Sequence, residues 1–179
     1  MKIRNQQGAW TEYQGLSNGT LDELSRLAAG CLKKQPFVLI CITGNKGIGK
    51  SLLGKSFRRH GIGCFRPRQI AVIDDDNMAV DFLFFFRRWN AIPCRGIDEL
   101  EPFYSYCSRK PIRVYIKSNP ESRISKADIV LQLSVDEETR KRRLMKRYGA
   151  QKGNAVAQAT QQYDPMPKIT FEHLLKAVL

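Results

Sequence analysis

The amino-acid sequence predicts an α/β protein with a mostly parallel central sheet flanked by helices. Four short runs of apolar, mainly β-branched residues lie at 37–43, 69–74, 112–117 and 128–135, each bounded by turn-forming residues. Such continuous runs are typical of strands buried on both faces. Segments of helical character separate the runs, and this alternation favours parallel strands joined by helical crossovers. A chain of 179 residues that is 42% hydrophobic suffices for one core.

The chain before the first strand divides into an arm and a helix. Residues 1–19 are polar with little periodicity, so we expect a flexible N-terminal arm and a single domain over 20–179. Thr20 and Glu23 have the spacing of a capping box, and the apolar residues up to Cys31 share one face. This pattern predicts a helix over 20–32.

A glycine-rich loop follows the first predicted strand. The stretch GNKGIGKS, from Gly44 to Ser51, fits G-x-x-x-x-G-K-[ST] and leads from a strand into a helix, the context that this motif requires. Glycines let the chain turn tightly and direct backbone N–H groups at phosphate oxygens, and the helix adds the positive end of its dipole. The predicted nucleotide-binding residues are Gly44, Asn45, Lys46, Gly47, Ile48, Gly49, Lys50, Ser51 and Leu52.

Two residues of this loop have expected chemical roles. Lys50 should reach the β- and γ-phosphates of a nucleotide, and Ser51 should ligate Mg²⁺. The sequence lacks the guanine-reading N-K-x-D pattern after its later strands, which argues against a regulatory GTPase, and it is short for a motor ATPase. A small phosphotransferase fits better.

Three consecutive acids end the second predicted strand. Asp74, Asp75 and Asp76 lie at its carboxyl end, where open α/β sheets bind ligands. Because strand side chains alternate, Asp74 and Asp76 should point one way and Asp75 the other. One carboxylate could accept a proton from a substrate hydroxyl while its neighbour holds Mg²⁺. A solvated acidic turn or a helix N-cap is the alternative interpretation.

A strongly basic segment follows the fourth predicted strand. Ser134 is a candidate N-cap, acids occupy 136–138, and Gly149 ends a helix over about 136–148. Arg143 and Arg147 lie one turn apart and could close over transferring phosphates. The same order of charges also suits an ordinary surface helix.

Other features give weaker signals. In residues 81–93, Phe82 and Trp89 lie near helical spacing, which favours a buried face, with an aromatic and basic wall of an acceptor pocket as the alternative. The C-terminal residues indicate a turn followed by a short helix from Thr170. The five cysteines show no C-x-x-C pair or His-rich neighbourhood that suggests a zinc site, so we expect reduced, apolar thiols. His60 and His173 are isolated, and the sequence assigns them no chemistry.

The overall charge restricts the possible partners. A net charge of +13 favours nucleotides, phosphorylated metabolites, nucleic acid or an acidic membrane surface. No apolar run approaches the roughly 18 residues that span a bilayer, and the first residues contain no secretory-type apolar segment. We therefore expect a cytoplasmic protein without a transmembrane segment.

Three stretches together resemble a known family. ITGNKGIGKS, IAVIDDDNM and ADIVLQLSVDEETRKRRLMKR are similar to nucleoside and nucleotide kinases of the P-loop class, especially the uridine kinase and dephospho-CoA kinase groups. The resemblance covers about residues 36–149 and implies a three-layer P-loop NTPase fold. It also implies that Asp76, with Asp74 two residues before it, is the catalytic aspartate, and that Arg143 and Arg147 belong to a lid. From the residues themselves we expect Ser51 and Asp74 to hold Mg²⁺ and Asp76 to act as the base.

The sequence as a whole predicts a Mg²⁺-dependent kinase. Its expected reaction moves the γ-phosphate of ATP, or of GTP, to a small hydroxyl or phosphate acceptor such as a nucleoside, a nucleotide or a phosphorylated cofactor. The alternative is a nucleic-acid-associated ATPase or nucleotide-dependent adaptor without kinase activity, and a polynucleotide 5′-hydroxyl kinase lies between the two. The acceptor and the oligomeric state stay open at this level.

Overall fold

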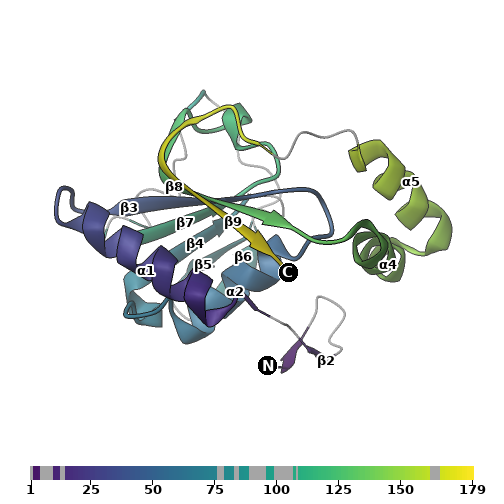
Figure 1. The fold of residues 1–179 in the computed structure, drawn as a ribbon. Helices are drawn as coiled ribbons and strands as arrows, with labels where there is room; N and C mark the ends of the chain where they lie inside the picture. Colours follow the sequence, from purple (N-terminus) through teal and green to yellow (C-terminus); the bar gives the residue numbers. More distant parts are fainter. Residues whose placement is uncertain are drawn as a thin grey trace.

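A seven-stranded sheet organises the chain in the computed structural model, which describes residues 2–4, 10–12, 15–75, 79–82, 85–88, 96–98, 107, 109–161 and 166–179. The strand order is β6-β5-β4-β7-β3-β8-β9 (Figure 1). The five strands from β4 to β9 in this order run parallel, and β5 and β6 extend them as antiparallel neighbours. The strands are β3 (Val38–Thr43), β4 (Ile70–Asp74), β5 (Ala79–Phe82), β6 (Phe85–Arg88), β7 (Ile112–Ile116), β8 (Lys126–Ser134) and β9 (Thr170–Val178).

The four predicted strands are confirmed as β3, β4, β7 and β8. All residues of β3, β4 and β7 are buried, as expected for strands covered on both faces. Side chains of β3 alternate between two cores: Val38, Ile40 and Ile42 join one, and Leu39 and Cys41 join the other. The sheet therefore has apolar packing on both sides.

Helices cover the first of these cores. Helix α1 (Asn18–Leu32) contributes Leu24 and Ala28, and α2 (Lys50–His60) contributes Leu53 and Phe57. The core on the other face includes Cys107, Ile124 and Ile169 in addition to strand residues. This α/β arrangement, a parallel sheet flanked by helices, is consistent with the predicted three-layer fold.

Two further helices lie beyond the carboxyl ends of the parallel strands (Figure 1). Helix α4 (Glu137–Tyr148) ends at Gly149, and α5 (Ala150–Gln161) follows directly. The two helices pack closely at Gly153, where a Cβ atom would lie 2.5 Å from Cα of Met145. Of the helices described, none is both long and apolar enough to cross a membrane.

The remaining described elements are short. Strands β1 (Lys2–Arg4) and β2 (Trp10–Glu12) pair antiparallel within the segment expected to be an arm, and η1 (Pro67–Gln69) and η2 (Pro120–Ser122) are single 3₁₀ turns. The predicted helix over 20–32 is confirmed with an earlier start. Its N-cap is Ser17, whose hydroxyl accepts the backbone N–H of Thr20. Glu23 pairs with Arg26 rather than completing a capping box.

Two predictions of helical structure are wrong. The segment from Thr170 is strand β9, which pairs parallel with β8 along its length. Part of residues 81–93 lies in β5 and β6, which pair with each other, so the aromatic spacing there does not mark a helix. In both segments pairing with a neighbouring strand overrides an apolar spacing that suits a helix.

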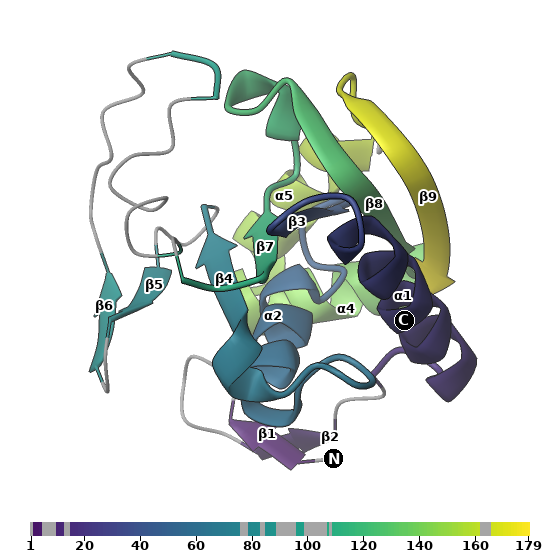
Figure 2. The same cartoon turned by 90° about the vertical axis from the view of Figure 1, so that its left-hand side faces the viewer.

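The strand order determines where ligands can approach. Strand β3 lies between β7 and β8, and the chain leaves β3 toward β4 on one side before reaching β8 on the other (Figure 2). Open α/β sheets bind ligands outside the carboxyl ends of their strands at such a reversal. The glycine-rich loop begins at this point.

Candidate phosphate-binding site

The loop from Gly44 to Ser51 turns sharply between β3 and α2. Three glycines have left-handed φ angles of +129° at Gly44, +88° at Gly47 and +112° at Gly49. A Cβ atom at Gly44 would lie 2.4 Å from the carbonyl oxygen of Leu133 in β8. Both the backbone angle and the close approach require glycine at this position.

The loop delivers the chain into the amino end of α2. Gly49 is the N-cap and supplies no side chain to cap the helix. The N–H groups in the first turn of a helix have no partner within the helix, and the helix dipole makes this end positive. The amino end of α2, preceded by a glycine loop, has the form of a backbone anion site.

Lys50 is the first residue of α2, and its side chain extends back into the loop. Its side chain is buried, with the residue only 5% exposed. The ammonium donates to the carbonyl oxygens of Gly44 at 2.8 Å and Asn45 at 3.2 Å, and to Oγ of Ser118 at 2.8 Å. A positive charge is thereby held where the loop, β3 and the end of β7 meet.

Ser118 is a member of the site for which sequence reasoning gave no role. It follows β7, the strand beside β3, and its carbonyl oxygen accepts the hydroxyl of Thr43. The adjacent Lys117 N–H donates to the carbonyl oxygen of Ile42. These bonds fix the end of β7 against the start of the loop. Ser118 could have been expected only from the knowledge that β7 lies beside β3, and the sequence alone does not give this strand order.

The predicted metal ligands lie at the carboxyl ends of the parallel strands, as the glycine loop does. Ser51 is in the first turn of α2, and Asp74 ends β4 with 3% of its surface exposed. Strand β7 separates β4 from β3. Asp76, the predicted base, lies outside the described residues, so its role stays a prediction.

Asp75 is the centre of a buried ion cluster. Its Oδ2 accepts the hydroxyl of Tyr115 at 2.7 Å and the ammonium of Lys117, and Nε of Arg123 lies 3.6 Å away. The carboxylate side chain is 2% exposed. Burial, and then the negative charge of Asp75, raises the pKa of the Tyr115 hydroxyl far above its usual value. Asp75 is thus satisfied by structural partners.

Helix α4 contacts the loop through two arginines. Nη1 of Arg143 donates to the carbonyl oxygen of Ile48 at 2.9 Å. Nη1 of Arg140 lies 3.4 Å from the carbonyl oxygen of Lys46, and the guanidinium also bonds Glu137 and two groups of α5. Arg147, one turn beyond Arg143, lies over the ring of Tyr148, 5.1 Å from its centroid.

The N-cap of α4 is Asp136, and the prediction of Ser134 was wrong. The Asp136 carboxylate accepts the backbone N–H of Thr139, and this bond lowers the Asp136 pKa.

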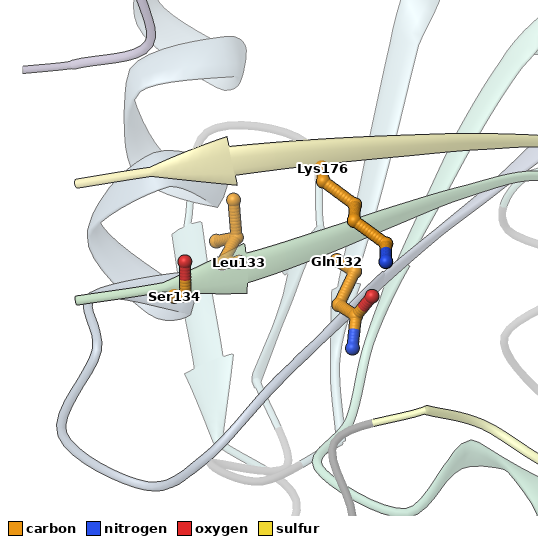
Figure 3. Close-up of a pocket in the computed structure, with 4 residues that line it drawn as sticks. All are labelled: Gln132, Leu133, Ser134 and Lys176. Carbon is orange, nitrogen blue, oxygen red and sulfur yellow. The ribbon is translucent and has the colours of Figure 1, made fainter.

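A small pocket lies beside the loop at the ends of β8 and β9. Its volume is about 180 Å³, and it is lined by Gln132, Leu133, Ser134 and Lys176. The polar ends of Gln132 and Lys176 lie on the same side of the two strands (Figure 3). Pockets that enclose a drug-sized ligand usually measure about 300–1,000 Å³. This pocket is smaller than that range, and we assign it no ligand.

Comparison with protein-family models, curated proteins and solved structures gave no significant match for this chain. The description of the site as a candidate phosphate-binding site therefore rests on its residues and geometry alone.

Proposed function

We propose that this protein is a Mg²⁺-dependent phosphotransferase that moves the γ-phosphate of ATP, or of GTP, to a small hydroxyl or phosphate acceptor. The observation that carries the proposal is the buried Lys50 ammonium inside a loop of three left-handed glycines that opens into the amino end of α2. A loop of backbone N–H groups around a lysine is suited to a chain of phosphates. The geometry favours a phosphate ligand over an apolar one.

The residues present fit both proposed ligands. Backbone N–H groups between Gly44 and Ser51 would hold phosphate oxygens, and Lys50 would exchange its carbonyl and hydroxyl acceptors for the β- and γ-phosphates. The oxygens of Ser51 and Asp74 are hard ligands of the type Mg²⁺ prefers. Bound Mg²⁺ would supply charge neutralisation to the phosphates.

The proposed transfer assigns a task to each remaining residue. The acceptor oxygen forms a bond to the γ-phosphorus while the bond from that phosphorus to the β–γ bridging oxygen breaks, and Asp76 takes the proton of an acceptor hydroxyl. Arg143, which contacts the loop through Ile48, would turn its free donors toward the transferring group. Arg147 would join it by changing its side-chain rotamer, because it now lies over the ring of Tyr148, its neighbour in α4.

The experiment is a transfer assay with a panel of acceptors. Purified protein is incubated with Mg²⁺, γ-labelled ATP or GTP, and nucleosides, nucleotides or phosphorylated cofactors in turn. The proposal predicts labelled product for at least one acceptor class and its loss in Asp76→Asn, while Asp76→Asn still binds nucleotide. Turnover unchanged by Asp76→Asn would remove Asp76 from the mechanism, and binding without transfer to any acceptor would leave a nucleotide-dependent adaptor.

A second function is favoured by the surface of α4. Arg142, Arg143, Lys146 and Arg147 are exposed on this helix, in a chain of net charge +13. A nucleic-acid-associated ATPase would use such cations on the phosphate backbone. Its DNA or RNA affinity would fall steeply with salt, and nucleic acid would stimulate ATP hydrolysis. Neither effect is expected for a kinase that acts on a small acceptor.

A further inference from the structure

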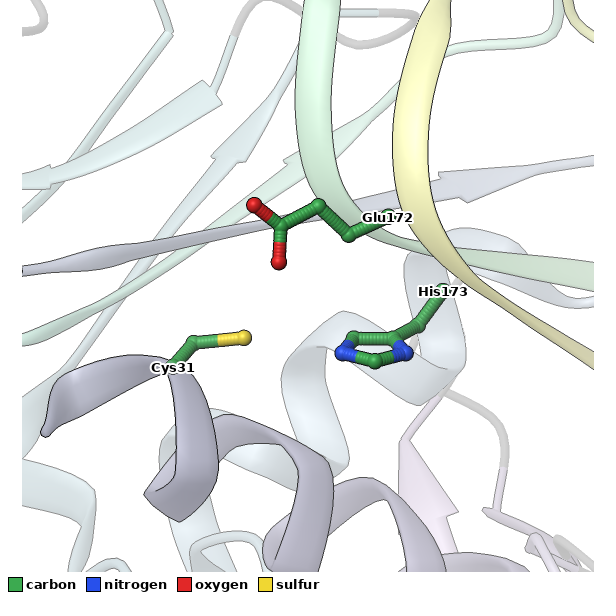
Figure 4. A group of neighbouring side chains, drawn as sticks. All are labelled: Cys31, Glu172 and His173. Carbon is green, nitrogen blue, oxygen red and sulfur yellow. The ribbon is translucent and has the colours of Figure 1, made fainter. Parts of the chain in front are cut away.

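Three potential metal ligands meet between α1 and the edge strand β9. The thiol of Cys31 lies in the last turn of α1, and Glu172 and His173 are neighbours in β9 (Figure 4). One ligand atom from each residue lies within 4.8 Å of the other two. Cys31 is buried, His173 is partly buried, and Glu172 is exposed. The cluster is therefore anchored inside the fold and open on one side.

The distances require only a small contraction to bind one ion. In a tetrahedral zinc site, bonds of about 2.0–2.3 Å place neighbouring ligand atoms roughly 3.4–3.6 Å apart. The exposed Glu172 side chain has the rotamer freedom to move toward an ion. The backbones of Cys31 and His173 are held in a helix and in a paired strand, so these two residues would adjust through their side-chain rotamers.

The charges around the cluster favour a cation. Glu172 and Asp128, whose carboxylate accepts the backbone N–H of Leu39, both act electrostatically on Cys31. Glu23 of α1 interacts in the same way with His173. Lys34 is the opposing cation that acts on Cys31, and it is exposed. Glu23 is paired with Arg26, so the negative local field comes from Glu172 and Asp128, the two carboxylates that act on Cys31, against the exposed ammonium of Lys34.

We propose that Cys31, Glu172 and His173 form a binding site for a divalent zinc-type cation, with water as the fourth ligand. A thiolate, an imidazole and a carboxylate are the donor set that zinc takes in proteins, whereas Mg²⁺ prefers oxygens alone. The ion would tie the carboxyl end of α1 to β9, the last strand at one edge of the sheet. This site is independent of the proposed nucleotide site.

The position of the cluster supports that independence. His173 pairs with Ile129 in the first half of β8, whereas Leu133 near the end of β8 touches the glycine loop at Gly44. The strands run parallel, so the cluster lies toward their amino ends and the loop lies at their carboxyl ends. A structural role in fixing α1 to the sheet follows from this placement.

The test uses Co²⁺ as a spectroscopic probe of the chelator-treated full-length protein. A thiolate ligand gives Co²⁺ a near-ultraviolet charge-transfer band, and a tetrahedral site gives strong visible bands. We expect one Co²⁺ per chain, displaced by one equivalent of Zn²⁺. In Cys31→Ser the charge-transfer band should disappear, and in Glu172→Gln the Co²⁺ affinity should fall at least tenfold.

Two controls keep the result interpretable. Cys64→Ser changes an exposed free thiol elsewhere in the chain and should leave the spectrum unaltered. Lys50→Ala should also retain the full spectrum, even if it abolishes nucleotide binding. If Cys31→Ser fails to fold, the Co²⁺ affinity of Glu172→Gln supplies the test, because a substitution at the exposed Glu172 should leave the fold intact. A wild-type protein without the charge-transfer band, or a band that survives Cys31→Ser in a folded protein, would overturn the proposal.

Discussion

The contact between the glycine loop and α4 gives the sharpest prediction for a single added methyl group. Gly47 has φ of +88°, and a Cβ atom there would lie 2.8 Å from Cγ of Leu144 and 3.0 Å from its Cδ2. Leu144 is only 1% exposed, so its side chain has little room to move. Gly47→Ala therefore adds both backbone strain and a steric clash.

The expected loss in the free energy of unfolding is the sum of the strain and the clash. A left-handed conformation costs a non-glycine residue about 1–3 kcal/mol, and overpacking a buried contact costs about another 1–3 kcal/mol. Gly149→Ala adds backbone strain without a clash, because the φ of Gly149 is +84°, its ψ is 163° and nothing lies within 4 Å of an added Cβ. We expect Gly149→Ala to lower the free energy of unfolding by strain alone, and Gly47→Ala to lower it by strain and clash together. The clash, about 1–3 kcal/mol, should disappear when Gly47→Ala is made in a Leu144→Ala background.

The assay is urea denaturation of both variants, together with calorimetric titration of ATP in the presence of Mg²⁺. Gly47→Ala should also weaken nucleotide binding, since moving α4 disturbs the bond from Arg143 to Ile48. Gly149→Ala should leave the nucleotide affinity unchanged. A loss from Gly47→Ala that is equally large in the wild-type and Leu144→Ala backgrounds would refute the packing of Leu144 against the loop.

Three further variants test neighbouring contacts. Ser118→Ala removes one acceptor of Lys50 and should lower the free energy of unfolding by about 1.5 kcal/mol in urea titrations, and no change would show that the bond is dispensable. Arg140→Leu removes the charged donor of the buried Ala157 carbonyl, which then keeps the more distant Thr160 hydroxyl, and should cost about 1–3 kcal/mol by the same method, whereas a neutral result would contradict the role of this guanidinium. The Asp136 pKa is lowered from its ordinary value of 3.8 by the backbone N–H of Thr139, so its stabilisation is complete above that value and is lost as the pH falls through the lowered pKa. Thermal unfolding between pH 2 and 6 should therefore show a steeper acid loss in the wild type than in Asp136→Asn, whose amide can cap without titrating, and parallel curves would rule out stabilisation by the Asp136 charge.

The central strands could be predicted from sequence because strands that are buried on both faces consist mainly of apolar residues. The runs around Ile40, Val72, Val114 and Val130 are mainly apolar and rich in β-branched residues, with Arg113 and Gln132 as polar interruptions, so they can be recognised without a period. The loop from Gly44 was recognisable for a related reason, since its glycines are required by backbone angles that other residues rarely adopt.

The edge strands and the wider site could not be predicted in the same way. The spacing of Phe171 and Leu174 suits a helix, and only pairing with β8 makes the segment a strand. Asp75 shows no local sign of its partners Tyr115 and Arg123, because they are distant in sequence. The link from Lys50 to Ser118 likewise depends on β7 lying beside β3, which is a property of the strand order.

The most direct measurement of the central claim is calorimetric titration of ATP, with Mg²⁺ present, into the wild type, Lys50→Ala and Lys126→Ala. Lys126 is an exposed lysine at the start of β8, at the opposite end of that strand from the loop, so its variant makes the same change of charge away from the site. We predict one nucleotide per chain for the wild type and Lys126→Ala, with affinity at least tenfold lower in Lys50→Ala. Absence of binding in the wild type, or equal affinity in all three proteins, would contradict a phosphate-binding loop at Gly44–Ser51.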